Sequence, residues 1–427
     1  MAFASVRGLD VWTSRITPEK VAAGRILFEH DWTVDDPLCG DGDGLGPVFN
    51  ATSCVACHFQ SGVGGSSGNA HNVSSFEIQT DISLESNHPQ RAPLIHDVTE
   101  GVIHSHAVDE LFQETKSIVR KLVEIPVSKT IERGCSSFTI TPPDPLVFHE
   151  LNSPALWGVG LIDDMSTLSI SLYGKARIAS RISQELGGDF GGNRLGLFRT
   201  QNNVAGKFGW KGQFASLESF VASACAMEIG LTNPQNAQMI AKKFQADKDA
   251  KLDMNEQQLH QLVCFVKSLP RPEQVLPTDK QELELVKRGE EVFVEIGCAQ
   301  CHAQNLGGIN GIYSDFHLYN LEPLIASSGA GGFYGDGEAE EEFNFDSTGP
   351  HPDQWQTPPL WGVADSAPYF HDGGSPTLLT AIKRHQGQAA FSQEKFSDSG
   401  STDQASLIAF LKSLRAPLLP KLNVESR

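Results

Sequence analysis

Two short stretches of this sequence share the pattern Cys-x-x-Cys-His. With 8 cysteines and 14 histidines in 427 residues, a random chain would contain the pattern only about 0.005 times. Chance therefore does not explain two copies. The residues are Cys54, Cys57 and His58 in the first motif, and Cys298, Cys301 and His302 in the second.

The spacing within each motif suits covalent attachment of a heme. Two thiols three residues apart lie on one helical turn, so both can form thioethers to the vinyl groups of one porphyrin. The adjacent histidine then reaches the iron as its proximal ligand. A zinc site would require a tetrahedral set of ligands, and a redox-active thiol pair would not need a histidine after the second cysteine. The motifs therefore predict two covalently bound hemes of the c type.

The segments around the two motifs repeat one another in the same order. Each motif follows an amphipathic helical stretch and precedes a Pro-x-Leu-Trp-Gly segment and an apolar closing helix. These segments are Pro18–Glu29, 153–159 and 262–269 in the first half, and Gln281–Glu295, 357–363 and 407–414 in the second. Small cytochromes c enclose the porphyrin between such helices. The repeat thus predicts a mainly α-helical protein with two cytochrome c-like heme domains.

A proline-rich stretch, residues 270–277, separates the two halves and reads as a linker. We therefore expect an N-terminal heme domain over residues 1–275 and a C-terminal heme domain over 276–427. Long loop insertions distinguish the halves. The first covers about residues 59–150, with a helix expected around 108–123, and the second covers 303–350 with an acidic patch at 338–342.

The sixth iron ligand decides whether a heme carries electrons or does chemistry. The last methionine is Met254, so no methionine can serve the C-terminal heme from within its own half. Residues 379–384 read as a helix, and His385 ends it. We predict that His385 is the distal ligand of the second iron; the alternative is a solvent-exposed histidine at a helix end. The other histidines considered are His317, His351 and His371.

The repeat gives a different result for the first heme. His385 follows His371 by fourteen residues, and the residue fourteen after Trp210 is Ala224, which cannot bind iron. Glu228 lies one helical turn further on the same face. An open iron beside an acid is suited to cleaving an O–O bond, because the acid can deliver a proton to the leaving oxygen. Glu228 is therefore a candidate catalytic acid; a helix-surface carboxylate is the alternative.

The composition limits the partners. A formal net charge of −19 argues against nucleic acid, whose phosphates require lysine and arginine. It suits a basic partner such as a small lysine-rich cytochrome, although solubility alone also explains it. No run approaches the roughly 18 apolar residues of a membrane span.

The first ten residues lack the charged and apolar regions of a secretory signal. Taken literally, this indicates a cytosolic protein. Covalent heme attachment takes place outside the cytoplasm, however, so we expect a periplasmic or otherwise exported protein whose signal was removed or replaced. The cysteines outside the motifs could pair in such a compartment, although two of them lie in apolar helical stretches that favour buried free thiols. These four are Cys39, Cys135, Cys225 and Cys264, of which Cys225 and Cys264 lie in the apolar stretches.

The order of the motifs, together with Pro368–Gly373 (PYFHDG), resembles the bacterial diheme cytochrome c peroxidase and MauG superfamily. Residues 208–211, 228–233 and 357–362 are most similar to its branch of diheme oxidoreductases, also called "thiol oxidoreductases". The resemblance covers most of the chain outside much of residues 59–150. Thiol chemistry itself finds no support, because both Cys-x-x-Cys pairs belong to heme motifs.

This resemblance implies a peroxidatic N-terminal heme, an electron-transfer C-terminal heme and a tryptophan between them, here Trp210. It also implies a calcium ion between the domains, held partly by backbone carbonyls that map to Ser366 and Pro368. In the resting state His71 could bind the first iron, as a nearby histidine does in the peroxidases.

Two departures from the family pattern bear on function. The peroxidases usually place a methionine on the electron-transfer heme, where His385 stands here, and a His/His iron has a lower potential than a His/Met iron. The family's distal glutamine maps to Phe220, which leaves Glu228 as the matching distal polar group.

We therefore expect a diheme oxidoreductase of the peroxidase type, with hydrogen peroxide as substrate and a small redox protein as electron donor. The alternatives are MauG-like oxidation of a protein partner and a non-enzymatic electron carrier with two closed hemes.

Overall fold

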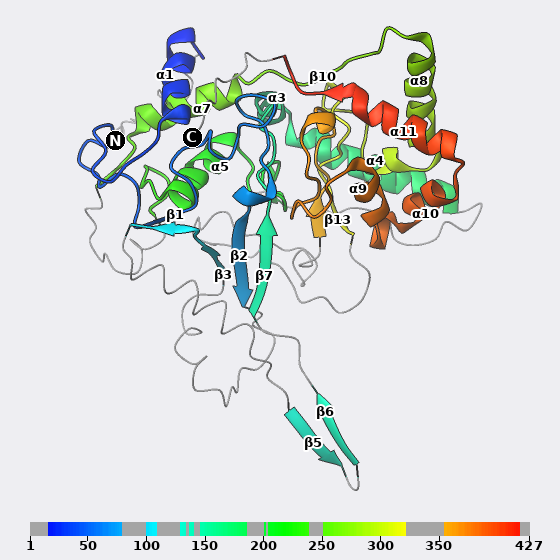
Figure 1. Cartoon of the computed structure of the whole chain (residues 1–427), viewed down its shortest axis with the longest axis horizontal. Helices are drawn as coiled ribbons and strands as arrows, with labels where there is room; N and C mark the ends of the chain where they lie inside the picture. The colour runs from blue at the N-terminus through cyan, green and yellow to red at the C-terminus, as the bar shows by residue number, and fades with distance from the viewer. Residues whose placement is uncertain are drawn as a thin grey trace, which may run out of the picture.

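The computed structural model describes residues 16–78, 100–108, 129–133, 136–140, 146–185, 200–201, 204–238, 251–321 and 354–418. These residues form mainly helices, with small antiparallel sheets between and beside them (Figure 1). The α-helices are α1 (Pro18–Glu29), α3 (Val159–Asp164), α4 (Thr167–Glu185), α5 (Leu217–Ala224), α7 (Glu256–Lys267), α8 (Lys280–Glu295), α9 (Leu378–Arg384), α10 (Ala390–Asp398) and α11 (Ser401–Ser413). A π-helical turn, Cys225–Ile229, continues α5.

The strands are short and pair antiparallel. One three-stranded sheet has the order β3-β2-β7, and the others are two-stranded. The bounds are β1 (Val48–Phe49), β2 (Val73–Ile78), β3 (Glu100–Ile103), β4 (His106–Ala107), β5 (Lys129–Arg133), β6 (Ser136–Ile140), β7 (Leu146–Leu151), β8 (Thr200–Gln201), β9 (Val204–Ala205), β10 (Glu273–Gln274), β11 (Asn305–Leu306), β12 (Ile309–Asn310), β13 (Leu318–Asn320), β14 (Gln354–Gln356) and β15 (Leu414–Arg415).

The four helices expected beside the heme motifs are present. Helix α1 has the predicted bounds, because Thr17 caps its first turn and Pro18 occupies the first helical position. Asp279 caps α8 in the same way. Residues 262–267 of the first closing segment lie in α7, and residues 407–413 of the second lie in α11.

The internal repeat corresponds to two crossed helix pairs, α1 on α7 and α8 on α11 (Figure 1). A glycine stands at each crossing. A Cβ atom on Gly24 would lie 1.9 Å from the carbonyl oxygen of Gln261, and one on Gly289 would lie 1.9 Å from that of Ser406. Any larger residue would push the helices apart, which explains the glycine in both copies.

Phenylalanine side chains pack between the two helices at each crossing. Phe28 packs on Phe265 with ring centroids 5.1 Å apart, and Phe293 packs on Phe410 at 5.4 Å. Phe28 and Phe410 are almost fully buried. Truncation of such a phenylalanine to alanine typically costs about 3–5 kcal/mol of unfolding free energy. The described part of the chain has one large hydrophobic cluster at each helix pair, and a third, smaller cluster lies between strands β2 and β3 and the π-helical turn.

The first insertion, predicted as a long loop with one helix, contains β-strands that were not predicted. Strands β2, β3 and β7 form a sheet in which Ser75 is opposite His149, and β5 and β6 form a separate hairpin. Apolar and polar residues alternate only weakly along these strands, so the sequence did not indicate β-structure here. The helix expected around 108–123 falls largely on residues 109–128, outside the described residues, as does the acidic patch 338–342.

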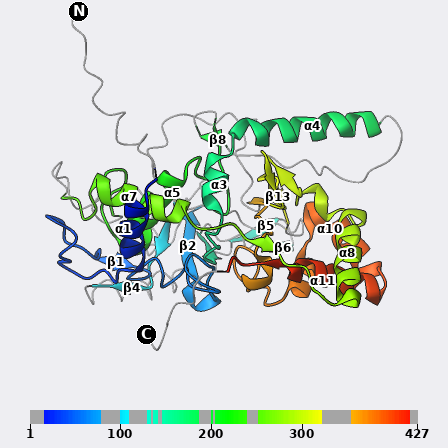
Figure 2. The ribbon, with the colours of Figure 1, turned by 90° about the horizontal axis from the view of Figure 1, so that it is seen from above.

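The two halves of the chain pack against each other. Helix α4, although it precedes the linker, extends along the half that contains α8 and α11 (Figure 2). A Cβ atom on its Gly174 would lie 2.6 Å from Nε2 of His317. The proline-rich linker is also fixed, because β10 pairs with β15 at the C-terminal end of α11. No helix among the described residues is long and apolar enough to cross a membrane.

Candidate functional site

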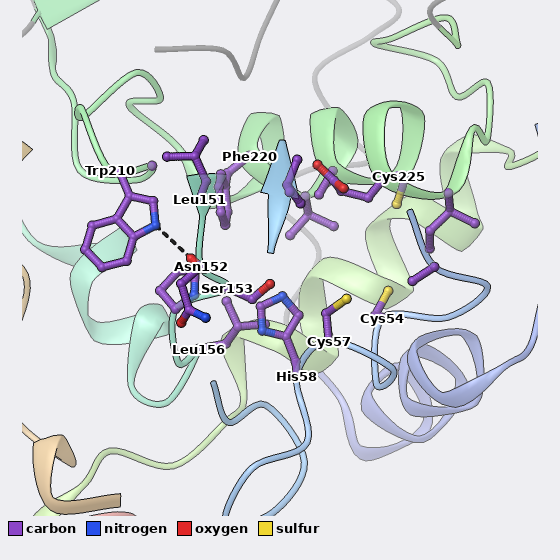
Figure 3. A pocket seen from close by; sticks show the side chains of 18 of the residues that line it. Cys54, Cys57, His58, Leu151, Asn152, Ser153, Leu156, Trp210, Phe220 and Cys225 are labelled. Atoms are coloured by element: carbon purple, nitrogen blue, oxygen red, sulfur yellow. Dashed lines mark hydrogen bonds between the residues drawn. The ribbon is translucent and has the colours of Figure 1, made fainter. Parts of the chain in front are cut away.

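The first Cys-x-x-Cys-His motif lines a deep apolar pocket. Cys54, Cys57 and His58 form one side of it, and Trp210 lies at the end opposite the two cysteines (Figure 3). Phe28 of α1 and Leu262 of α7 also contribute to the walls. The crossed helix pair therefore encloses the motif, as expected from the repeat.

His58 is held in the protonation state that an iron ligand needs. Its Nδ1 lies 3.2 Å from the carbonyl oxygen of Gly65; since a carbonyl only accepts, Nδ1 is the donor. The lone pair then resides on Nε2. Burial lowers the pKa of His58 to about 4, so the ring is neutral at physiological pH.

The opposite wall of the first pocket is formed by the end of α5 and the π-helical turn. Ser216 caps α5, and Ala224 ends it. The turn that follows contains Glu228, and both Ala224 and Glu228 line the pocket with His58. The structure thus brings the predicted acid and the predicted heme motif together.

Glu228 is held by a residue that the sequence did not reveal. The side-chain amide of Asn50 donates to Oε2 of Glu228 at 2.6 Å, and the backbone N–H of Ser105 donates to Oδ1 of Asn50 at 2.9 Å. Burial raises the pKa of Glu228 to about 7, although the hydrogen bond from Asn50 opposes the shift. Glu228 is half-buried because it faces the pocket.

The second motif lines a second pocket, together with His385. The Nδ1 of His302 donates to the carbonyl of Tyr313 at 3.1 Å, and the Nδ1 of His385 donates to that of Ala381 at 2.8 Å. Each ring therefore keeps its lone pair on Nε2. The two ring centroids are 6.4 Å apart. Since metal–imidazole bonds are about 2 Å long, this separation accommodates one metal ion between the rings.

His385 reaches the pocket because α9 ends there. A capping box of Thr377 and Thr380 fixes the start of the helix, and His385 is its C-cap residue. The ring of Phe370 packs against His385 with centroids 5.1 Å apart. Burial lowers the pKa of His385, which keeps its imidazole neutral. His385 thus lines the pocket and is not a solvent-exposed histidine at a helix end.

The other candidate histidines of the C-terminal half have different surroundings where the structure describes them. His371 lines the second pocket but stacks on Trp355 with centroids 3.4 Å apart. His317 is buried, and its Nδ1 donates to the backbone carbonyl of Asp315 at 2.7 Å. His351 lies outside the described residues.

Trp210 borders both pockets, as the resemblance implies for the tryptophan between the hemes. Its indole N–H donates to the backbone carbonyl of Asn152 at 2.8 Å (Figure 3). Phe220 and Trp355 also border both pockets. Sequence reasoning missed Trp355; its place next to the Thr-Pro-Pro-Leu-Trp-Gly segment was the one available signal.

Both pockets fit a heme of the c type by the chemistry of their residues. Each has two thiols three residues apart, a neutral histidine with its lone pair on Nε2, and walls of mostly apolar side chains. Three of the thiols are protonated at physiological pH, because burial raises the pKa of Cys54, Cys57 and Cys298 to about 12.

Of the three further predicted ligands, His71 lies outside the first pocket, whereas the two residues predicted to bind calcium border the second. His71 packs edge-on against Phe59, with centroids 5.3 Å apart, and is not among the residues that line the first pocket. Ser366 and Pro368 border the second pocket. Within the described ranges, no group of three or more His, Cys, Asp or Glu side chains could hold a metal ion. The calcium site stays a prediction.

The cysteines outside the motifs are free and buried where the structure describes them. These are Cys39, Cys225 and Cys264; Cys135 lies outside the described residues. Burial raises the pKa of each of the three thiols.

A family model described as "Di-haem oxidoreductase, putative peroxidase" matches residues 200–414, just over half of the chain. This chain belongs to the di-haem oxidoreductase family. Membership implies heme cofactors and oxidoreductase chemistry. The match includes Trp210, Glu228, the second heme motif and His385.

The search of curated proteins finds no match to this di-haem oxidoreductase. Two solved structures are similar to it. The hydrazine synthase of Kuenenia stuttgartiensis, determined under xenon pressure, shares 21% identity over 38% of this chain and 57% of its own, with a TM-score of 0.27. A MauG-like protein associated with microbial copper homeostasis shares 18% identity over 50% of this chain and 73% of its own, with a TM-score of 0.32. This chain spans less than two thirds of the hydrazine synthase chain.

Proposed function

We propose that this di-haem oxidoreductase reduces hydrogen peroxide in the first pocket with electrons that enter through the second. The observation that carries the proposal is the difference between the two distal walls. His385 faces His302 in the second pocket, whereas Ala224 occupies the corresponding position in the first, beside Glu228. In this proposal the second histidine would close one site, and the other would be open to peroxide.

Each motif would hold one heme covalently. Cys54 and Cys57 would form the thioethers of the first and His58 would be its proximal ligand; the second motif would do the same in its pocket. When bound, a heme supplies redox-active iron that can exchange single electrons and reduce peroxide. His302 and His385 would both bind the second iron, which suits electron transfer.

Glu228 supplies one of the two protons that peroxide reduction needs, and solvent supplies the other. The reaction consumes two electrons and two protons and yields two molecules of water. With its pKa raised to about 7, the Glu228 carboxyl is mostly protonated in mildly acidic solution and substantially so at neutral pH. It can therefore donate to the departing oxygen. Asn50 fixes the orientation of the carboxyl through its hydrogen bond.

Trp210 provides an aromatic ring between the two pockets. Its hydrogen bond to Asn152 fixes the indole. Electrons can therefore pass from the second site to the first in two steps through the indole, each shorter than the distance between the sites. The donor would be a small redox protein, for which the net charge of −19 favours a basic surface.

The remaining parts of the proposal concern organisation. The two crossed helix pairs support two cytochrome c-like domains, 1–275 and 276–427, with α4 packed across the boundary. Calcium bound through the carbonyls of Ser366 and Pro368 would stabilise their contact. Heme attachment of the c type would place the protein in the periplasm or another exported location.

The spin states of the two ferric hemes test the proposal. Electron paramagnetic resonance of the oxidised protein should show one low-spin heme with two histidine ligands and one high-spin heme. If both hemes are low-spin in the oxidised protein, and the heme that remains ferric after one-electron reduction and addition of calcium is still low-spin, the result would instead support a closed electron carrier.

A further inference from the structure

A second tryptophan, Trp355, occupies the region between the two pockets. It lies in β14, where it is opposite Tyr319 of β13, and only 7% of its surface is exposed. Like Trp210, it lines both pockets. Position alone therefore does not determine which of the two indoles gives up an electron.

The two faces of Trp355 have different neighbours. The imidazole of His371 stacks on one face, with centroids 3.4 Å apart and the planes inclined by 5°. The ammonium group of Lys211 lies 4.2 Å from the centroid of the indole ring. Because the imidazole already fills one face, Nζ of Lys211 must lie over the other. Lys211 is itself 3% exposed.

A cation in this position stabilises the reduced form of the indole. It attracts the electron-rich face of the neutral ring. Loss of an electron would place a positive charge on the ring, about 4 Å from the ammonium group, and like charges at that distance repel. The repulsion is weakly screened because Lys211 and Trp355 are both buried. Lys211 therefore makes Trp355 harder to oxidise.

Trp210 has the opposite environment. Its indole N–H donates to the carbonyl oxygen of Asn152 at 2.8 Å, and the negative end of that carbonyl dipole favours positive charge on the ring. Lys211 directly follows Trp210 in the sequence. This short segment thus directs the Trp210 indole toward a carbonyl and the Lys211 ammonium group toward the Trp355 indole.

We propose that Lys211 determines which tryptophan is oxidised, by keeping Trp355 reduced so that electrons leave from Trp210. The inference rests on the proposed function, which names hydrogen peroxide as the oxidant. Peroxide takes up two electrons and two protons to form two waters. When no external donor supplies the electrons, both come from the holoprotein: Trp210 loses one to become a radical cation facing the Asn152 carbonyl, and a bound heme would supply the other.

The test is to locate the oxidised tryptophan. Holoprotein is treated with excess peroxide without reductant, digested, and mapped by mass spectrometry for oxygen adducts at the two residues. In the wild type, adducts at Trp210 should predominate. In Lys211→Met, which removes the charge and keeps the length, the ratio of Trp355 to Trp210 adducts should rise roughly tenfold or more, given the strength of charge interactions at this distance. Lys211→Arg keeps the charge and should keep the wild-type ratio.

An unchanged ratio in Lys211→Met, or equal adducts in the wild type, would overturn the inference. If Lys211→Met fails to retain both hemes, the wild-type ratio and the variant Trp355→Phe provide the test. Oxidation of Trp210 should be unaffected in Trp355→Phe. If oxidation of Trp210 is lost in this variant, Trp355 is on the electron-transfer route and the inference is wrong.

A second oxidant separates this inference from the proposed function. Azide radicals generated by pulse radiolysis oxidise tryptophan without heme or peroxide. The ratio should again rise in Lys211→Met relative to Lys211→Arg. A holoprotein that is inert to peroxide but shows this rise would refute the peroxidase proposal and retain the role of Lys211. No rise with azide radicals would refute the role of Lys211.

Discussion

The imidazole of His385 faces that of His302 with ring centroids 6.4 Å apart. Both rings donate Nδ1–H to backbone carbonyls, so both direct lone pairs on Nε2 into one pocket. In the other pocket, α5 ends at Ala224 instead of a histidine, and the turn beyond it contains Glu228. The two pockets therefore differ at the wall opposite the heme motif.

The first prediction concerns heme attachment. Replacement of Cys298 by alanine removes one thioether and should weaken or abolish binding of the second heme, while the first heme remains. The matched control is Cys264→Ala, a buried thiol outside the motifs, which should retain both hemes. Intact mass spectrometry reads the result; a matured wild-type protein with one heme or none would refute two attachment sites.

The second prediction concerns the distal ligand. His385→Gly should convert the low-spin second heme into a high-spin or water-ligated one, because glycine offers no donor. Absorption and electron paramagnetic resonance spectra report the change. If the spectra are unaffected, another histidine binds that iron, and His371 would be tested next.

The internal repeat could be predicted from the sequence because its signals are local. Helical amphipathicity and the repeated order of segments can be seen within short stretches of sequence, so α1 and α8 were predicted within a residue of their bounds. The correspondence between Ala224 and His385 followed from the same spacing.

The long-range contacts could not be predicted in this way. Asn50 meets Glu228 across 178 positions, and Trp355 meets Lys211 across the boundary between the halves. No periodicity relates such residues, because the fold alone brings them together. The sheet of β2, β3 and β7 was missed for a related reason, since its strands are separated by long connections.

The third prediction concerns the catalytic acid. Glu228→Gln cannot release a proton and should slow the reaction with peroxide by about 10²–10⁴-fold, with both hemes still bound. Glu256→Gln, an exposed residue on α7, is the matched control and should be unchanged. Rapid mixing with peroxide measures the rate, and a normal rate in Glu228→Gln would remove the acid assignment.

The pH dependence of that reaction gives a fourth prediction. The acid form of Glu228 is present below its pKa of about 7, so the rate should fall as the pH rises through that value. Asn50 lowers the pKa of Glu228 by stabilising its carboxylate. Asn50→Leu should therefore move the decline to higher pH by roughly one unit, since a hydrogen bond to a charged group contributes about 1.5–3 kcal/mol. A decline at the wild-type pH would show that Glu228 does not control it.

The reaction of the fully reduced protein with one equivalent of hydrogen peroxide tests the central claim most directly. Peroxide accepts two electrons, one from each heme, so stopped-flow absorbance should show rapid oxidation of both hemes and complete loss of peroxide. The second heme should be oxidised more slowly in Trp210→Phe, which removes the indole between the pockets. A reduced protein, supplied with calcium, whose spectrum does not change on mixing with peroxide would contradict the account.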